Sequence, residues 1–323
     1  MFLSCGDALF DLFMDSDANV NTVALSGGVG GSPLNVAIGL CRLGHHSRFL
    51  TKVSSDPFGQ RMSRHLQENN LDTSLCIETD QNTTLAIVEK NTDGSAKYVF
   101  YLDNTADASI TSDDIPAQLS NDIKFLHVGS YSTVLPQTGA ALQSLVKREA
   151  ANRAISYDPN LRLMVQPDIN VWKAAFDHIS QHAFVIKASD EDVDALLGEN
   201  KHRSFLELCL ERGAQAAFIT RGPNGAMAMD SSGQLVDVAG VSVEVEDTVG
   251  AGDTFQAAIL HWLAANQHVG ELENGRTQLA GSLDLSACVE FALQAAAITC
   301  TRRGADLPTL ADVESAMSKT KKS

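Results

Sequence analysis

Short strand-like runs alternate with helix-like segments along most of the chain, and this alternation limits the possible folds more than any other feature. The order is strand 2–13, helix 33–44, strand 123–131, helix 138–150, strand 154–160, helix 168–179, strand 182–188, helices 190–198 and 203–213, and strand 216–220. Strands that take turns with helices build a parallel sheet that is covered by helices on both faces. The sequence therefore predicts an α/β fold with ligand sites at the carboxyl ends of the strands.

The length and the charge of the chain narrow the possible functions. With 323 residues, of which 44% are hydrophobic and 20% charged, the chain can bury one large core, so we expect a single α/β domain with an appendage. Its 24 Lys and Arg against 40 Asp and Glu give a net charge of −16, which repels polyphosphate backbones. We therefore expect no nucleic-acid partner, and any phosphate must be small and held locally by backbone NH groups, a few cations or a metal.

Cysteine usage and hydropathy predict a cytoplasmic protein. The six cysteines lie far apart, with no C-x-x-C pair and no spacing that suits zinc, so we expect buried thiols in a reducing compartment. The first residues lack the basic region of a signal peptide, and no run of about 18 apolar residues occurs. We expect no membrane association.

Residues 83–103, TTLAIVEKNTDGSAKYVFYLD, interrupt the alternation. Two strand-like runs flank the turn-rich NTDGS at 91–95, which predicts a β-hairpin inserted into the α/β chain. Together with the strand-like residues after Asp7, this hairpin could form a small sheet that caps the ligand site. The alternative is an edge hairpin without a role in binding.

A glycine-rich loop precedes the first helix, in SGGVGGSPLNVAIGLCRLG at 26–44. Ser32 and Pro33 suit the N-cap and the first helical position, and Asn35 would lie in the first turn, where a ligand can meet the helix N-terminus. Glycines let the backbone approach such a ligand closely. The loop has neither the G-x-G-x-x-G spacing of a dinucleotide site nor the Gly-Lys of a Walker A loop. A plain loop-to-helix junction with a solvated Asn35 is the alternative.

Two further strands end in polar groups. FITRGPNGAMAM at 218–229 is a strand, a tight turn and a strand, in which Thr220 and Gly222 could present a hydroxyl and an NH group to a phosphate. An ordinary hairpin is the alternative. ISYDPNLR at 155–162 ends in Arg162, and an arginine suits sugar hydroxyls or a phosphoryl group.

The segment EDTVGAGDTFQAAIL at 246–260 places Asp253 where a glycine-rich turn runs into a helix. The bare NH groups of such a turn usually attract anions from solution, so a carboxylate at this point calls for a reason. Asp253 either caps its helix or has a chemical role beside an anion site.

Taken in order, GGSPLNVA, DPNLR, TRGPNG and DTVGAGDTF resemble the ribokinase-like (PfkB) family of sugar and nucleoside kinases. The resemblance covers nearly the whole chain, down to AAAITCTRRGAD, and DTVGAGDTF is highly specific. GDALFD, DPNLR and KASDEDVDALLG look more like fructokinases than ribokinases. The resemblance implies a three-layer α/β/α sandwich with a mainly parallel sheet, in one domain over 1–323, and a small β-sheet lid from about 8–30 and 83–105.

The resemblance also implies a reaction, the transfer of the γ-phosphoryl group of ATP to a sugar hydroxyl, which is catalysed by positioning, charge stabilisation and proton removal. An anion hole for the developing phosphoryl charge would be formed by the NH groups of Gly250, Ala251 and Gly252. Asp253 would take the proton from the attacking hydroxyl, with its carboxylate exposed to the sugar and not used as a helix cap.

The same resemblance implies the binding positions. Arg162 would contact sugar or phosphoryl oxygen. The sugar positions match Asp7, Asp11, Gly30, Gly31, Asn35, Tyr101 and Asp253. The nucleotide positions match Ser189, Thr220, Gly222, Gly225, Gly250 and Gly252.

Two ions are implied as well, Mg²⁺ with the nucleotide and K⁺ as an activator. The positions that hold a monovalent cation, largely through backbone oxygens, match Asp247, Val249, Thr299, Arg302 and Gly304. Such a cation could orient the anion hole, and a simple strand–helix connection is the alternative.

The chain departs from the family pattern at two places. Many members have Asn-x-x-Glu where this chain has Ser189 and Asp192, which alters the water network expected around magnesium. Leu102 replaces an arginine that often precedes the return of the lid, which removes a cation near the substrate and makes the fructose assignment less direct.

Three hypotheses from different classes follow. The first is an ATP-dependent sugar kinase, a dimer through its lid, that converts D-fructose to fructose 6-phosphate, with 2-keto-3-deoxygluconate, ribose or a nucleoside as alternative acceptors. The second is a non-catalytic sugar- or nucleotide-binding regulator, which the intact GAGD sequence at 250–253 disfavours. The third is a nicotinamide oxidoreductase, which the spacing of the glycine loops disfavours.

Overall fold

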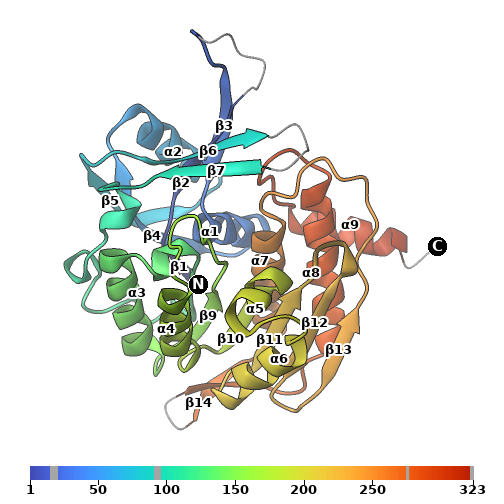
Figure 1. Cartoon of the computed structure of the whole chain (residues 1–323). Coiled ribbons are helices and arrows are strands. Elements are labelled where there is room, and N and C mark those ends of the chain that lie inside the picture. Colours follow the sequence, from blue (N-terminus) through green and yellow to red (C-terminus); the bar gives the residue numbers. More distant parts are fainter. Residues whose placement is uncertain (15–20, 91–95, 274–275, 321–323) are drawn as a thin grey trace.

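The computed structural model describes residues 1–14, 21–90, 96–273 and 276–320, and its centre is a nine-stranded sheet (Figure 1). The strands are, in sheet order, β13 (Leu235–Val238), β12 (Ala226–Asp230), β11 (Ala216–Thr220), β10 (Val185–Ser189), β9 (Ala154–Asp158), β8 (Phe125–Gly129), β1 (Phe2–Cys5), β4 (Ser47–Ser54) and β5 (Asp72–Thr79). All pairs from β5 to β11 are parallel, and β12 and β13 extend the sheet antiparallel. The expected mainly parallel sheet is confirmed.

Helices cover both faces of this sheet, so the layers are α/β/α, as the alternation predicts (Figure 1). On one face lie α3 (Pro136–Glu149), α4 (Ile169–Ser180), α5 (Asp190–Leu197) and α6 (His202–Glu211). On the other lie α1 (Ser32–Arg42), α7 (Ala251–Ala265), α8 (Leu285–Cys300) and α9 (Leu310–Thr320). Short 3₁₀ turns occur at Asp107–Ser109, Ser112–Asp114, Tyr131–Thr133 and Gly222–Asn224.

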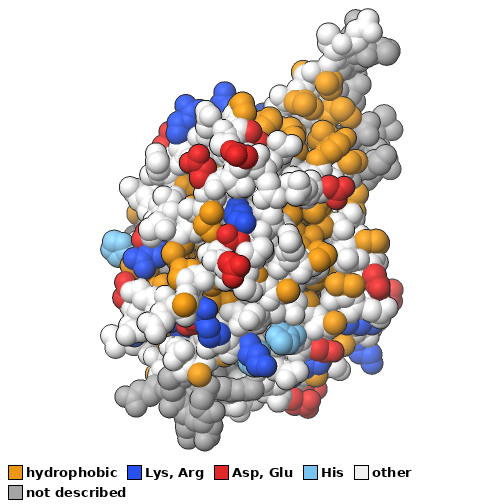
Figure 2. Space-filling view, turned by 90° about the vertical axis from the view of Figure 1, so that its left-hand side faces the viewer, with side chains coloured by type: hydrophobic (Ala, Val, Ile, Leu, Met, Phe, Trp, Pro, Cys, Tyr) orange, Lys and Arg blue, Asp and Glu red, His pale blue; other side chains and the backbone are white. Residues whose placement is uncertain are grey.

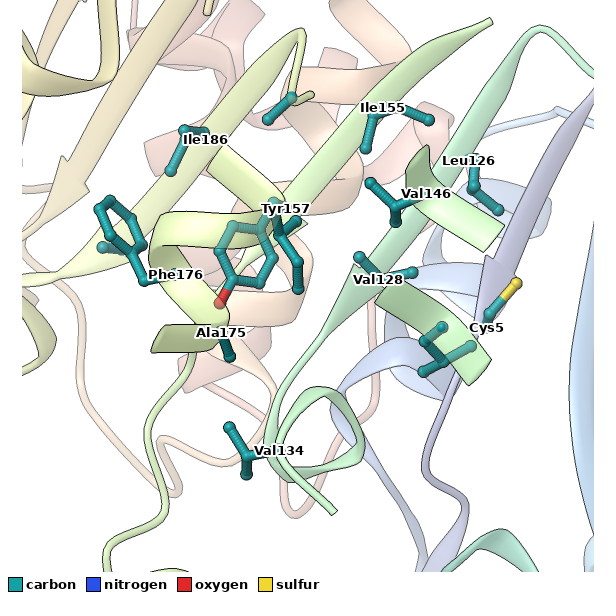
Figure 3. Packing of buried hydrophobic residues seen from close by; sticks show 14 of the residues in the cluster. Cys5, Leu126, Val128, Val134, Val146, Ile155, Tyr157, Ala175, Phe176 and Ile186 are labelled. Carbon is teal, nitrogen blue, oxygen red and sulfur yellow. The ribbon is translucent and has the colours of Figure 1, made fainter. Parts of the chain in front are cut away.

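The parallel strands are apolar because both of their faces are buried. Figure 3 shows Leu126, Val128, Ile155, Tyr157 and Ile186 of the strands packed with side chains of α3 and α4. Burial of this kind removes roughly 1.5–3 kcal/mol of hydration cost for each large apolar side chain. It fixes the strand ends, and therefore the groups that follow them, in space.

The N-terminal run 2–13 differs from the sequence expectation, because it forms two strands in different sheets. Gly6 has φ 141°, a value that side chains rarely adopt, and a Cβ there would lie 2.4 Å from Ser132 Oγ. The chain therefore leaves β1 at Gly6 and continues as β2 (Leu9–Met14). Asp7 lies at this break, at the carboxyl edge of the main sheet.

A second sheet of four strands has the order β3-β2-β6-β7, with β3 (Leu25–Gly30), β6 (Thr84–Lys90) and β7 (Ala96–Tyr101). β2 pairs parallel with β6, whereas the other two pairs are antiparallel. The predicted hairpin at 83–103 and its association with the strand after Asp7 are therefore both present. The predicted turn at 91–95 and residues 15–20 of the expected lid lie outside the described residues.

Two elements complete the chain. α2 (Pro57–Glu68) packs with α1 beneath the second sheet through an apolar cluster that includes Phe10, Ile38 and Met62. A separate two-stranded sheet joins β14 (Val269–Glu273) and β15 (Arg276–Leu279). Within the described ranges, no helix combines the length and the apolar character that crossing a bilayer requires.

Candidate active site

A cavity of about 880 Å³ lies at the carboxyl edge of the main sheet, where the sequence places the ligand site. Ser189 and Thr220 end β10 and β11 there, and Ser130 directly follows β8. The second sheet contributes Leu9, Asp11, Phe13 and Phe100 to the lining. One wall is therefore built by the main sheet and its helices, which we call the sheet wall, and the other by these four residues, which we call the lid wall.

Two helix N-termini meet in the sheet wall. Ser32 Oγ donates to Asp253 Oδ1 at 2.7 Å, and Asn35 Nδ2 donates to Asp253 Oδ2 at 2.8 Å. The predicted N-cap role of Ser32 is wrong by one residue, since Gly31 occupies the N-cap and Ser32 begins the helix. Its hydroxyl is therefore free to hold the carboxylate of α7, and Asn35 points into the site rather than being a solvated side chain.

Asp253 itself is 8% exposed and lines the cavity. The carboxylate therefore faces the cavity, as expected for a group that meets the sugar, although the first turn of α1 shields it from bulk solvent. The N-cap of α7 is Gly250, and no side chain caps this helix, so Asp253 does not act as the cap of its own helix. Both carboxylate oxygens keep lone pairs for a further hydrogen bond.

The glycine turn before Asp253 has the geometry of an anion site. Gly250 is left-handed at φ 78°, and a Cβ there would lie 2.8 Å from Ala305 Cβ. Gly252 lines the cavity in the first turn of α7, where NH groups have no intrahelical acceptor. Ala251 differs from the expectation, since its NH donates to Thr248 O at 3.2 Å and it does not line the cavity.

Two more carboxylates, those of Asp7 and Asp11, line the same cavity. Asp7 accepts a hydrogen bond from the Ser32 NH at 3.2 Å, and burial, with the nearby charge of Asp107, raises its pKa to about 7. Burial raises the pKa of Asp11 to about 6, with Asp253 and Asp247 adding to the rise and Arg162 opposing it. These two predicted sugar-binding carboxylates therefore hold a proton more readily than an exposed aspartate does.

The predicted glycines Gly30 and Gly31 shape this corner. A Cβ at Gly30 would lie 2.3 Å from Asp11 Oδ2, so the missing side chain makes room for the Asp11 carboxylate. Gly31 has φ 120° and lines the cavity, whereas Gly30 does not. Gly30 is thus a spacer for the sugar site.

On β7 the residue that lines the cavity is Phe100, and not its neighbour Tyr101, which the resemblance implied. Tyr101 is 58% exposed and is not among the residues that line the cavity. Phe100 lines it and packs edge-on against Tyr131, with ring centroids 6.0 Å apart. Successive strand residues point to opposite faces, so Phe100 and Tyr101 cannot both face the cavity.

Arg162 lines the cavity and is exposed. Its Nη1 donates to Asn160 Oδ1 at 2.7 Å and to Leu161 O at 2.9 Å, which holds the guanidinium over its own loop. The predicted contact with sugar or phosphoryl oxygen is therefore sterically open, and its remaining donors can serve it.

The predicted nucleotide side is brought together at the ends of β10 and β11. Thr220, Gly222 and Ser189 all line the cavity. Gly225 does not; it has φ 87° and a Cβ there would lie 2.0 Å from Val238 O, so its role is to form the turn. Gly225 thus shapes the turn between β11 and β12 and has no direct place in the lining of the cavity.

The Ser189–Asp192 departure from the family pattern forms a capping box for α5. Ser189 Oγ accepts from the Asp192 NH at 3.0 Å, and Asp192 Oδ2 accepts from the Ser189 NH at 2.9 Å. Asp192 Oδ1 accepts from the Leu161 NH at 2.8 Å, and Asp192 lines the cavity. One such carboxylate suits Mg²⁺ that is carried mainly by phosphates and water. Across the described part of the chain, no cluster of three or more His, Cys, Asp or Glu could hold a metal alone.

Sequence reasoning missed a buried ion pair behind the glycine turn. Lys187 on β10 is 3% exposed and lines the cavity, and its Nζ lies 2.8 Å from Oδ2 of Asp158, which is fully buried at the end of β9. Burial favours neutral Lys187, but the Asp158 carboxylate outweighs it and the pKa of Lys187 is raised. A lysine inside the apolar run AFVIKA was the available signal, because lysine is almost never fully buried without a partner.

The predicted potassium residues come from two segments that meet behind the glycine turn: the loop at 247–249, and the last residues of α8 with the turn that follows them. Asp247 accepts from the Val249 NH at 3.1 Å and from the Gly304 NH at 2.9 Å. Thr299 Oγ1 lies 2.8 Å from Thr254 Oγ1 on α7. The Arg302 side chain turns away to Asp312, with Nη2 3.2 Å from Oδ2, so only its backbone could serve an ion.

Comparison with known proteins gives a consistent result. The model of the pfkB family carbohydrate kinases matches residues 2–312. A fructokinase of Rhizobium leguminosarum bv. trifolii is 36% identical over 260 residues, which cover 80% of this chain and 78% of that protein. Probable fructokinase-7 of Arabidopsis thaliana is 31% identical over 301 residues, which cover 90% of this chain and 84% of that protein.

Solved structures agree with these relatives. An uncharacterized sugar kinase from Pyrococcus horikoshii is 26% identical, with a TM-score of 0.81 over 97% of this chain and 96% of that one. Its complex with ATP has 25% identity and a TM-score of 0.77 over 98% of this chain and 100% of that one. A match that spans the chain, a fold shared along its whole length, and a cavity that joins an anion turn to a held carboxylate lead to one conclusion: this chain belongs to the pfkB family of carbohydrate kinases and is an ATP-dependent sugar kinase.

Proposed function

We propose that this sugar kinase is a fructokinase, which transfers the γ-phosphoryl group of ATP to the 6-hydroxyl of D-fructose. The observation that carries the proposal is the Asp253 carboxylate, held by Ser32 and Asn35 beside the glycine turn and facing the cavity. Relatives at 36% and 31% identity are named fructokinase and probable fructokinase, which supports fructose as the acceptor.

The chemistry needs a base and an anion site at one place. The hydroxyl oxygen of fructose attacks the γ-phosphorus, the new P–O bond forms, and the bond to the bridging oxygen breaks with its electron pair leaving on ADP. Asp253 accepts the proton of the hydroxyl. The first-turn NH groups of α7 at Gly252 and Asp253 stabilise the charge on the phosphoryl oxygens.

The fructose hydroxyls are recognised by carboxylates from both walls. Asp7 and Asp11 offer acceptors at the Gly30–Gly31 corner, and Asn35 offers an amide oxygen beside Asp253. Phe100 covers an apolar face of the sugar, and Arg162 closes the cavity mouth. Asp7 and Asp11 orient the acceptor, whereas Asp253 is the residue that reacts.

The nucleotide lies along the ends of β10 and β11, at Ser189, Thr220 and Gly222. Mg²⁺ bound to its phosphates would be held from the protein by Asp192, directly or through water, and would neutralise phosphate charge. K⁺ would lie among the backbone oxygens of the segments at 247–249 and 299–304, where it would fix the glycine turn. Support for this ion site is the pairing of the two segments through Asp247.

The second sheet supports a homodimer. It carries apolar side chains that are exposed in the single chain, Leu25, Val99 and Tyr101, and Val23 just before β3 is exposed as well. Figure 2 shows hydrophobic side chains gathered over the upper part of the molecule, below the projecting end of β3. Exposed groups of this kind typically mark an interface. The dimer is expected in the cytoplasm, as the separated free thiols suggest.

The test is a coupled assay of ADP release with a panel of acceptors. D-Fructose should give the highest kcat/KM among fructose, ribose, glucose, 2-keto-3-deoxygluconate and adenosine, and Asp253→Asn should lose the fructose-dependent rate. A higher kcat/KM for another acceptor would contradict fructose as the substrate but would still agree with a sugar kinase. ADP release that no acceptor stimulates would contradict the function itself.

A further inference from the structure

We propose that Lys187 is a further catalytic residue, a fixed cation that contacts the transferred γ-phosphoryl group of ATP. The inference deepens the proposed function and rests on it for the identity of the transferred group. It concerns a side chain that opens the KASDEDVDALLG motif but that neither the expected anion hole nor the expected binding positions include.

The first support is position. Lys187 belongs to β10, and its side chain reaches the first turn of α7: a Cβ placed on Gly252 would lie 3.1 Å from Lys187 Nζ. The ammonium also lines the cavity. It is therefore next to the same NH groups that bind the phosphoryl oxygens, on the side of the glycine turn that lacks a side chain.

The second support is the arrangement of its donors. An ammonium has three donors, and Lys187 Nζ gives one to Asp158 Oδ2 at 2.8 Å. Asp158 is fully buried at the end of β9 and does not line the cavity, so it anchors the ammonium from behind. Lys187 itself lines the cavity, so its remaining donors are available to a ligand there. A buried ion pair adds little stability over apolar residues of similar size, so stability alone is a weak reason for it.

The third support is the charge around the cavity. Its lining holds the carboxylates Asp7, Asp11, Asp190, Glu191, Asp192 and Asp253, which repel a triphosphate. Among the described lining residues, the other cations are Arg162 and Arg221. Arg221 forms an ion pair with Asp237, and Arg162 is held over the loop at 160–161. Lys187 is thus the cation that stands beside the glycine turn, where phosphoryl charge develops.

A role in γ-phosphoryl binding predicts an effect that depends on the third phosphate. The reference protein is the wild type, in which the Asp158 carboxylate keeps Lys187 charged. The test protein is Asp158→Asn/Lys187→Met, in which no unpaired charge is left buried, so that folding is preserved. Lys52→Met is the matched control, because Lys52 forms a 2.8 Å ion pair with Asp114 away from the cavity.

The affinities for ATP and for ADP are measured by calorimetry without sugar, and kcat is measured with fructose. Relative to the reference, the test protein should bind ATP at least about tenfold more weakly and ADP within about twofold, because a charge-assisted contact to the γ-phosphate is lost. Its kcat should fall by about 10²-fold, the effect of losing one donor that stabilises transition-state charge. Lys52→Met should change neither the ratio of ATP to ADP affinity nor kcat.

The outcomes separate this inference from the acceptor assignment. An unchanged ratio of ATP to ADP affinity would show that Lys187 only neutralises Asp158 and would overturn the inference. A changed ratio of ATP to ADP affinity in a protein that does not phosphorylate fructose would support the inference and contradict fructose as the acceptor. If the test protein unfolds in a thermal scan, Lys187→Arg decides: it keeps the charge, so the preference for ATP should persist, and its loss would contradict a charge contact.

Discussion

The two walls of the cavity are built differently, and the difference separates chemistry from recognition. The sheet wall holds its reactive groups almost without solvent contact, with Asp253 fixed by two hydrogen bonds and Lys187 by an ion pair. The lid wall belongs to the four-stranded second sheet, whose outward-facing residues, such as Tyr101, are largely exposed. Asp253 and Lys187 thus lie on close-packed elements of the main sheet and its helices, whereas Asp11 and Phe100 lie on the smaller second sheet.

The largest effect is expected in the sheet wall. Asp253→Asn keeps the shape of the side chain and removes the basic oxygen, so kcat should fall by about 10²- to 10⁴-fold. ATP binding by calorimetry should change by less than about 1 kcal/mol, because the lost interaction belongs to the transition state. Ser32→Ala, which leaves the carboxylate but removes one of its donors, should have a smaller effect. A variant that keeps more than about a tenth of kcat, with chemistry rate-limiting, would point to another base, and Asp11 would be the next candidate.

The second prediction concerns Asp11 on the lid wall and the pH dependence of stability. Burial raises its folded pKa from 3.8 to about 6, so between these values the folded protein binds a proton that the unfolded chain has lost. The free energy of unfolding of the sugar-free protein should therefore fall as pH rises through this window. Asp11→Asn should remove the contribution of Asp11 to this pH-dependent decrease. It should therefore raise the free energy of unfolding above pH 6 by about 1–3 kcal/mol.

The measurement is urea unfolding at about pH 4.5, inside the window, and at about pH 7.5, above it. Asp113→Asn, a change at an exposed aspartate outside the cavity, is the control. Asp11→Asn should also raise the KM for fructose while it stabilises the free protein. Equal pH dependence in the wild type and in Asp11→Asn would show that the Asp11 carboxyl is not desolvated by the fold.

The third prediction separates the two faces of β7. Phe100→Ala should raise the KM for fructose by about three- to tenfold, since it removes apolar contact area from the lid wall. Tyr101→Ala, on the opposite face, should leave that KM within about twofold and instead weaken the proposed dimer, measured by analytical ultracentrifugation. A larger KM effect for Tyr101→Ala than for Phe100→Ala would reverse the assignment of the two faces.

The smallest effect is expected from the ion site behind the glycine turn. Replacing K⁺ by a large organic cation at constant ionic strength should lower kcat by about two- to fivefold, if the cation fixes the NH groups of the turn. Asp247→Asn should make kcat insensitive to the same exchange. Full activity of the wild type without K⁺ would mean that the segments at 247–249 and 299–304 only support the structure.

Local sequence patterns predicted the elements well where neighbouring residues decide them. The helix after the loop at 26–31 and the hairpin at 83–103 are present because glycine, proline and strand formers act on their own backbone. The break at Gly6 was missed because its cause, the contact with Ser132, comes from a residue 126 positions away. The role of Ser32 was assigned wrongly for the same reason: its partner Asp253 is 221 residues away.

The sequence by itself determined the α/β alternation, the family and the glycine turn with its aspartate, because these are written in contiguous residues. The tertiary structure decided which groups share the cavity. It placed Asn35 and Ser32 on Asp253, turned Phe100 inward and Tyr101 outward, and set Lys187 behind Gly252. The physical reason is that parallel strands bring their carboxyl ends to one edge regardless of separation along the chain, so contacts among those ends depend on strand order and register, which no local pattern contains.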